Sequence, residues 1–247
     1  MTPAADTTTA PPRDEIATRK PPGLVAATLV VMRKDLLIEW RTRARLNALV
    51  FFAISTLLLF SFALGANTTA LRAHASGYFW LAIVFASILS LSESFRIESE
   101  NHALEGLKLA ATDARAVFIG KALGNTVLLW GLGLILSPLS IAVFDLRVKM
   151  SLWLLIGIIG IGAMSISAAG TFYSAIASNA RARDVLLPIL LFPVLVPVLI
   201  SCVKATALIF DGDAMGQMGS WLTMLGALNV IYWALGLVLF PRITEDI

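Results

Sequence analysis

Four carboxylates of this sequence lie in one short polar stretch, and they form its densest acidic group between the first long apolar run and the last. They are Glu98, Glu100, Glu105 and Asp113, within RIESENHALEGLKLAATDARAVFIGK at residues 96–121. Long apolar runs flank this stretch on both sides. A polar helix held between two membrane spans is a place where a partner outside the membrane can bind, so this acidic stretch is our first candidate for a contact site.

Motifs for catalysis and for nucleotide or metal binding are missing from the sequence. There is no G-x-x-x-x-G-K-[ST] loop to cradle phosphates, no H-E-x-x-H, no C-x-x-C and no G-x-S-x-G. The two histidines, His74 and His102, stand apart, and an isolated histidine is usually an ordinary polar residue. No nucleophile is paired with a base. We therefore predict that the chain is not an enzyme and has no ATPase or metal site of its own.

The acidic stretch has two faces if it is helical. One face carries polar side chains at i, i+3, i+7 and i+10, and the other carries apolar side chains interrupted by Glu100. An acidic amphipathic helix too short to cross a membrane fits a groove on a partner protein. A solvated hairpin between spans explains the pattern equally well, so the residues alone leave both interpretations open. Thr112 or Asp113 could cap the helix that follows. The polar face comprises Glu98, Asn101, Glu105 and Lys108, and the apolar face Ile97, Leu104, Leu107 and Ala111.

The composition places the chain in a membrane. Of its 247 residues, 58% are hydrophobic and 14% are charged, whereas a soluble domain averages roughly 45–50% apolar and about 25% charged residues. The apolar residues come in long blocks, which is typical of an integral membrane protein. Residues 1–23, rich in Thr, Pro and Ala, are predicted to be a disordered cytoplasmic tail. The net charge of +3 gives no indication of nucleic-acid binding.

Six apolar runs approach the ~20 residues that a helix needs to cross a bilayer. None alternates with period two, so the predicted fold class is all-α, with six transmembrane helices in residues 46–241. The fifth run contains Pro188, Pro193 and Pro197, which favour a kink that serves either as a hinge or as a fixed bend. No charge lies at the centre of a run, which disfavours a secondary carrier. The runs are 46–64, 77–95, 117–144, 152–176, 184–209 and 220–240.

Residues 24–45 before the first run are amphipathic. On a helix, Leu29, Met32, Leu36 and Trp40 share one face, opposite a face that carries basic residues. Such a helix lies naturally in the membrane surface with its cations toward anionic headgroups, although its role could be only that of a topology anchor. The spacing also predicts an i, i+4 ion pair of Glu39 with Arg43. The basic face contains Lys34, Arg41 and Arg45.

Basic residues favour one orientation in the membrane. With the N-terminus in the cytoplasm, most of the 19 Lys and Arg residues fall in segments that face the cytoplasm. The exceptions are Arg72, Arg147, Lys149 and Lys204. Because cytoplasmic loops of membrane proteins are enriched in Lys and Arg, both termini and the acidic stretch are predicted to be cytoplasmic.

Several segments, in this order and spacing, resemble the CcmB family, the membrane subunits of ABC-type haem exporters in cytochrome c maturation. The resemblance covers residues 32–241, with a longer N-terminal tail than the family and Asn67 where the family often has a nearby proline or acid. The segments are KDLLIEWRTRARLNALVFF (34–52), FSFALG (60–65), ALEGLKLAATDARAVFIGKALGN (103–125), LSPL (136–139) and LLPILLFPVLVPVLISCVKAT (186–206).

The resemblance implies an ABC-2-like permease of the bacterial inner membrane, with six spans after an N-terminal elbow helix. It implies a separate CcmA-like ATPase subunit that binds ATP and engages the loop between the second and third spans. It also implies CcmC-like and CcmD-like partners, a homodimer, and haem as the species transported or handled, with release of a haem-loaded chaperone. Because the sequence shows no pair of haem ligands, we expect no cofactor bound by this chain itself.

Mapped onto this chain, the resemblance makes residues 96–116 the cytoplasmic coupling loop and residues 98–109 its helix. The residues then expected to contact the ATPase are Glu98, Leu104, Glu105, Gly106, Leu107 and Lys108, with Arg41, Arg43 and Arg45 of the elbow helix nearby. Two other interpretations of the sequence stay open. The chain could be the permease of an ABC-2 exporter for another substrate, or a membrane scaffold that transports nothing.

Overall fold

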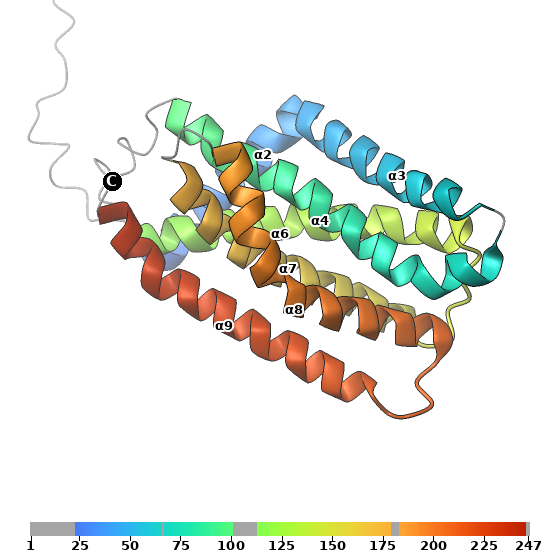
Figure 1. Cartoon of the computed structure of the whole chain (residues 1–247). Helices are drawn as coiled ribbons and strands as arrows, with labels where there is room; N and C mark the ends of the chain where they lie inside the picture. The colour runs from blue at the N-terminus through green and yellow to red at the C-terminus, as the bar shows by residue number, and fades with distance from the viewer. Residues whose placement is uncertain (1–22, 66, 101–112, 179–182, 246–247) are drawn as a thin grey trace, which may run out of the picture.

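A computed structural model of the chain describes residues 23–65, 67–100, 113–178 and 183–245. All regular structure in these residues is α-helical, which confirms the predicted fold class. The helices run lengthwise in one bundle, except that the N-terminal helix α2 crosses behind the bundle at one end (Figure 1). In chain order they are α2 (Leu24–Thr42), α3 (Ala44–Leu64), α4 (Thr68–Glu100), α6 (Ala114–Val143), α7 (Leu152–Ser178), α8 (Arg183–Asp211) and α9 (Met218–Glu245).

Six of the described helices, α3 to α9, are long and apolar enough to cross a membrane, and they match the six predicted runs. The second span differs, because it begins at Thr68 and not at residue 77. Its first turns are obscured in the sequence by the polar residues Arg72 and His74. Their helical conformation starts from a capped end, where Asn67 Oδ1 accepts a hydrogen bond from the backbone N–H of Ala70 (3.1 Å).

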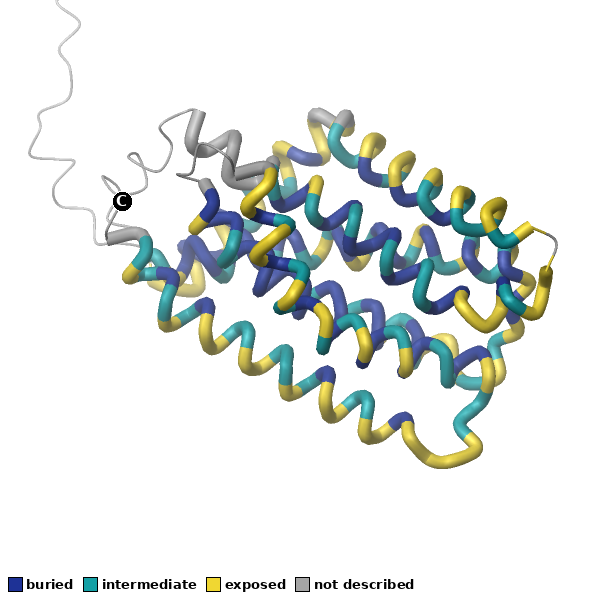
Figure 2. Tube along the Cα trace, viewed as in Figure 1, coloured by how far each residue is buried: buried dark blue, intermediate teal, exposed yellow. Residues whose placement is uncertain are grey.

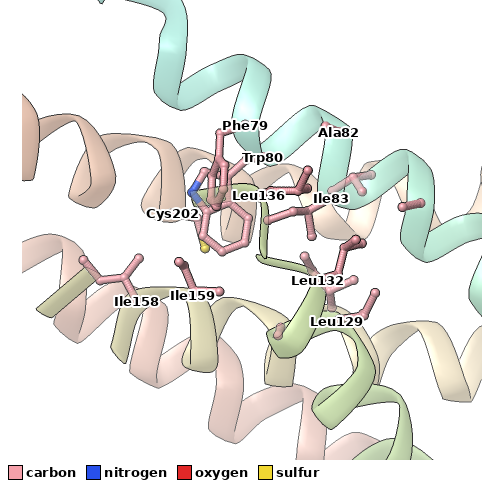
Figure 3. Packing of buried hydrophobic residues seen from close by; sticks show 14 of the residues in the cluster. Phe79, Trp80, Ala82, Ile83, Leu129, Leu132, Leu136, Ile158, Ile159 and Cys202 are labelled. Carbon is pink, nitrogen blue, oxygen red and sulfur yellow. The ribbon is translucent and has the colours of Figure 1, made fainter. Parts of the chain in front are cut away.

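Helices α4 and α7 form the centre of the bundle. Helix α7 packs against α4, α6, α8 and α9, and small residues allow this close approach. A Cβ atom added at Gly162 would clash with the ring of Trp80, which is fully buried. Trp80 lies against Cys202 in the core (Figure 3), and its Nε1 donates a hydrogen bond to Thr206 Oγ1 of α8 (3.0 Å). Buried residues follow α4 and α7, whereas α3 and α9 expose their outer faces (Figure 2).

The alternation of the spans brings several chain segments to the same end of the molecule. This end contains α2, the end of α4, the start of α6 and the end of α9 (Figure 1). Helix α6 begins there with Asp113 as its cap, because Asp113 Oδ1 accepts a hydrogen bond from the backbone N–H of Arg115 (2.9 Å). The segment between α4 and α6 therefore starts and finishes at the end of the bundle where α2 lies.

Helix α8 contains all three prolines of the fifth predicted run, Pro188, Pro193 and Pro197. It continues through them as one helix from Arg183 to Asp211, and Figure 1 shows it bent along its length. A proline inside a helix removes one backbone hydrogen bond and clashes with the preceding turn, which accounts for a bend. Whether the bend moves during function stays a prediction.

Candidate functional site

Four charged side chains meet where α2 crosses the end of the bundle, and we call them the ion cluster: Asp35, Glu39, Arg45 and Lys121. Lys121 Nζ of α6 lies 3.3 Å from Asp35 Oδ2 of α2. Arg45 Nη1 of α3 lies 2.9 Å from Glu39 Oε2 of α2. The side chains of Lys121 and Glu39 are only 1% and 5% exposed. Charges this deeply buried are costly unless paired, so the two ion pairs fix α2 in register against α3 and α6.

Arg45 also connects the ion cluster to α4. Its Nη2 donates hydrogen bonds to the backbone carbonyl of Ser90 (2.6 Å) and to Ser90 Oγ (2.8 Å). Ser90 lies in the part of α4 that leads toward Glu100, the last residue of that helix. Hydrogen bonds from a guanidinium are charge-assisted and strong. A movement of this end of α4 would therefore displace Arg45 and, through its ion pair with Glu39, helix α2.

The chain turns from α2 into α3 at Arg43, whose φ of 46° places it in the left-handed region. Its backbone N–H donates to the carbonyl of Glu39 and ends α2. The Arg43 guanidinium lies over the Trp40 ring, 5.7 Å from the ring centroid. The predicted pair of Glu39 with Arg43 is thus wrong, because the helix stops before the i, i+4 geometry is completed. Glu39 pairs with Arg45, on the next helix.

A glycine on α6 allows α2 to pack closely. A Cβ atom at Gly120 would lie 2.8 Å from Val31 Cβ and 2.9 Å from the Thr28 carbonyl oxygen. The buried face of α2 consists of Ala27, Thr28, Val31 and Glu39. The apolar face expected from the sequence does not pack against the bundle, since Leu29 and Trp40 remain 53% and 68% exposed. Helix α2 therefore buries its small and charged residues against the bundle and leaves its larger apolar residues outside.

The environment of Glu39 changes its acidity. Burial raises the pKa of the Glu39 carboxyl above the usual 4.5, the Arg45 guanidinium lowers it, and the Asp35 carboxylate raises it again, with a net increase. A cavity of about 40 Å³ borders Glu39, Asp35 and Lys121, which is room for a water-sized molecule. The cluster can thus take up a proton at Glu39 more readily than an exposed glutamate.

The residues predicted to contact the ATPase and those predicted on the elbow helix form two groups. Leu104, Glu105, Gly106, Leu107 and Lys108 lie outside the described residues, while Glu98 lies in the last turn of α4 and its side chain is not described. The remaining three are the elbow residues. Arg41 is exposed in the last turn of α2, Arg43 forms the turn between α2 and α3, and only Arg45 joins the ion cluster.

Sequence reasoning missed Asp35, Glu39 and Lys121 as members of one cluster. A signal was present, because Asp35 and Glu39 stand at i and i+4 in α2 and therefore share a face. Lys121 is the one lysine in the apolar run 117–144, and Gly120 and Gly124 on either side of it leave room for another helix. No pattern within one segment, however, indicated that these charges meet.

The fold and the site together define a class: all-helical, six-span membrane proteins of the permease type, with a preceding helix held to the spans by buried ion pairs. Comparison with known proteins gives the family. The model of the CcmB family, described as CcmB protein, matches residues 26–242, and the chain belongs to this family.

Several relatives share the printed name Heme exporter protein B. The chain is 30% identical to the protein of Rhodobacter capsulatus over 69% of this chain and 78% of that protein. It is 29% identical to the protein of Haemophilus influenzae over 82% and 90%, and 30% identical to the protein of Pseudomonas aeruginosa over 81% and 89%. The six spans and the family place the chain among multi-pass proteins of the bacterial inner membrane.

Proposed function

We propose that this chain is the membrane permease subunit of an ABC-type haem exporter of cytochrome c maturation. In this role it couples ATP hydrolysis by a separate ATPase subunit to haem handling and to release of a haem-loaded periplasmic chaperone. The observation that carries the proposal is the CcmB match over residues 26–242, together with relatives named Heme exporter protein B over most of their length.

The coupling element in this proposal is the acidic stretch that connects α4 to α6. It begins and ends where α2 crosses the bundle, and Glu98 lies at its start. ATP-driven closure of the ATPase would move this stretch, and α4 would carry the movement to Ser90. The bonds from Arg45 to Ser90 and Glu39 give a rigid path from α4 to α2 and α3.

Several further features belong to the same proposal. Both termini are cytoplasmic, as the distribution of Lys and Arg favours. The partners are a CcmA-like ATPase, CcmC-like and CcmD-like membrane proteins and a second copy of this chain. The bend at Pro188, Pro193 and Pro197 of α8 is the hinge along which the spans tilt. Haem is the handled species and not a resident cofactor.

The test is to express Glu105→Ala and Leu107→Ala variants together with the ATPase and haem-handling subunits. Copurification of the ATPase and the yield of mature c-type cytochrome are the two readouts. We expect both to fall for each variant, because the variants remove a polar and an apolar contact from the two faces of the acidic stretch. Arg147→Ala, in the loop between α6 and α7 at the other end of the bundle, is the matched control and keeps both readouts.

The two readouts also separate coupling from scaffolding. A lower cytochrome yield with an intact complex supports coupling, because the partners are then held together without being driven. Normal copurification and normal yield for both variants would refute the role of the acidic stretch. If the complex still assembles with every variant and the cytochrome yield never changes, the result would favour the interpretation of this chain as a membrane scaffold.

A further inference from the structure

A groove opens on the outer surface of the protein between α2, α3 and α6, and we call it the apolar groove. Its volume is about 890 Å³, within the ~300–1,000 Å³ that is usual for ligand pockets. It is separate from the small cavity beside the ion cluster, although Leu36, Glu39 and Leu128 border both. Its lining is Leu29, Met32, Arg33, Leu36, Leu37, Glu39 and Trp40 of α2, Leu46, Leu49 and Val50 of α3, and Val127, Leu128, Leu129, Gly131, Leu132 and Ile135 of α6.

Charge in the apolar groove is confined to one edge. Among its lining residues, all of which the structure describes, only Arg33 and Glu39 are ionisable. The Glu39 carboxylate is bound by Arg45, at 2.9 Å from Nη1. Arg33 is exposed and is not part of any ion pair found among the described residues. The apolar groove therefore presents hydrocarbon along its floor and a cation at its α2 edge.

The cation and the hydrocarbon lie at different depths. Arg33 belongs to α2, which crosses the end of the bundle (Figure 1) and is not one of the six candidate spans. A basic helix of this kind lies at the membrane surface, and Arg33 is expected there. The α6 residues of the floor run from Val127, near the middle of that helix, to Ile135, away from the Ala114 end. At 1.5 Å per residue this floor extends about 12 Å into the membrane. A phospholipid has the same order of groups, with its phosphate at the surface and its acyl chains below.

We propose that the apolar groove binds one anionic phospholipid, with its phosphate against Arg33 and an acyl chain along Leu128, Gly131 and Ile135. Charge complementarity selects this occupant, because anionic lipids are attracted to cations at the membrane surface. An apolar transmembrane helix of a second copy would fill the apolar floor but would give Arg33 no anionic partner at the membrane surface. The bound lipid contacts α2, α3 and α6 together and therefore steadies the elbow helix on the spans.

Gly131 offers a way to fill the groove without disturbing the protein. A Cβ atom at Gly131 would meet nothing within 4 Å, so a larger side chain can extend into the apolar groove. Gly157 of α7 is equally open but lies outside the apolar groove. Arg242, exposed in the last turn of α9, is a matching cation away from the apolar groove. These residues supply one blocking variant, Gly131→Phe, and two controls, Gly157→Phe and Arg242→Gln.

The experiment is native mass spectrometry of the full chain in detergent, titrated with phosphatidylglycerol and, separately, with zwitterionic phosphatidylethanolamine. We expect the unmodified chain to bind a first phosphatidylglycerol about tenfold more tightly than phosphatidylethanolamine, because the ammonium of the zwitterionic headgroup neutralises its own phosphate and repels Arg33. Arg33→Gln abolishes the preference, and Gly131→Phe abolishes the first binding event. Gly157→Phe and Arg242→Gln bind as the unmodified chain does. Circular dichroism verifies folding, and Gly131→Leu replaces Gly131→Phe if the larger residue prevents it.

Three results would overturn the proposal. The first is equal binding of the two lipids by the unmodified chain, and the second is an unchanged preference in Arg33→Gln. The third is a dimer that retains no lipid and dissociates in Gly131→Phe, since the occupant would then be a second copy. Each result is obtained with the chain alone, so it does not depend on the ATPase or on haem export.

Discussion

Along helix α6, the contact with α2 differs chemically from the contact with α7. At its start, α6 meets α2 through the buried ion pair of Lys121 with Asp35 and through the close approach at Gly120. At nearly the same level but on another face, α6 meets α7 through neutral hydrogen bonds: Ser167 Oγ donates to the Ala122 carbonyl (2.5 Å), and Asn125 Nδ2 donates to Thr171 Oγ1 (3.2 Å).

The difference follows from what each face of α6 meets, because α2 is not one of the six candidate spans whereas α7 is. Near the end of the bundle, headgroups and water can reach part of the surface, so paired charges are tolerated there. Between spans a charge would be far more costly, and neutral hydrogen bonds with small residues supply the contacts. The α2 contact can therefore respond to charge, pH and lipid, whereas the α6–α7 contact depends on shape. The following substitutions test this comparison.

The largest effect is expected from Arg45→Ala. Removing this side chain takes from buried Glu39 its 2.9 Å partner and from Ser90 two hydrogen bonds. Breaking a buried ion pair in this way costs roughly 3–5 kcal/mol. Thermal unfolding in detergent, followed by circular dichroism, measures the loss. In a double-mutant cycle with Glu39→Ala the two losses should add to far more than the double variant loses, and simple additivity would show that the pair is not coupled.

A smaller effect is expected from adding the same side chain at two glycines of α6. In Gly133→Val the new atoms clash with Ile159 of α7, and overpacking of this kind costs about 1–3 kcal/mol. In Gly120→Val the new atoms clash with Val31 and displace α2. No such displacement of a whole helix is expected from the substitution in the core. We expect a lower melting temperature for Gly133→Val and, for Gly120→Val, mainly faster proteolysis of α2. Equal changes in both measurements would contradict the distinction between the two contacts.

The smallest effect concerns pH. Because burial raises the pKa of Glu39, the folded state holds its proton more tightly than the unfolded state does. Stability from this group is therefore present below the usual 4.5 and is lost as pH rises through the raised pKa. Glutamine at position 39 does not titrate. Relative to Glu39→Gln, the unmodified protein should therefore gain stability as the buffer pH falls from about 7.5 toward about 4.5. A melting-temperature difference that stays constant over this range would contradict the raised pKa.

Local patterns were sufficient for some features of this protein. The length and composition of the apolar runs predicted an all-α fold with six spans, and the structure confirms it. The place of Thr112 and Asp113 before an apolar run predicted that either could cap the next helix, and Asp113 caps α6. The start of α4 was predicted too late in the sequence, because the polar residues Arg72 and His74 interrupt the apolar pattern. The structure shows that these residues are already helical.

What the sequence by itself determined is the membrane class, the spans and the family, because each depends on composition or on order along the chain. The tertiary structure alone decided which charges meet. Asp35 and Lys121 are 86 residues apart in sequence, and Arg45 reaches Ser90 across 45. It also decided which face of α2 is buried and that the opposite face borders the apolar groove. Helical periodicity states that a helix has two faces, but the neighbours that each face meets are fixed only when distant segments pack together.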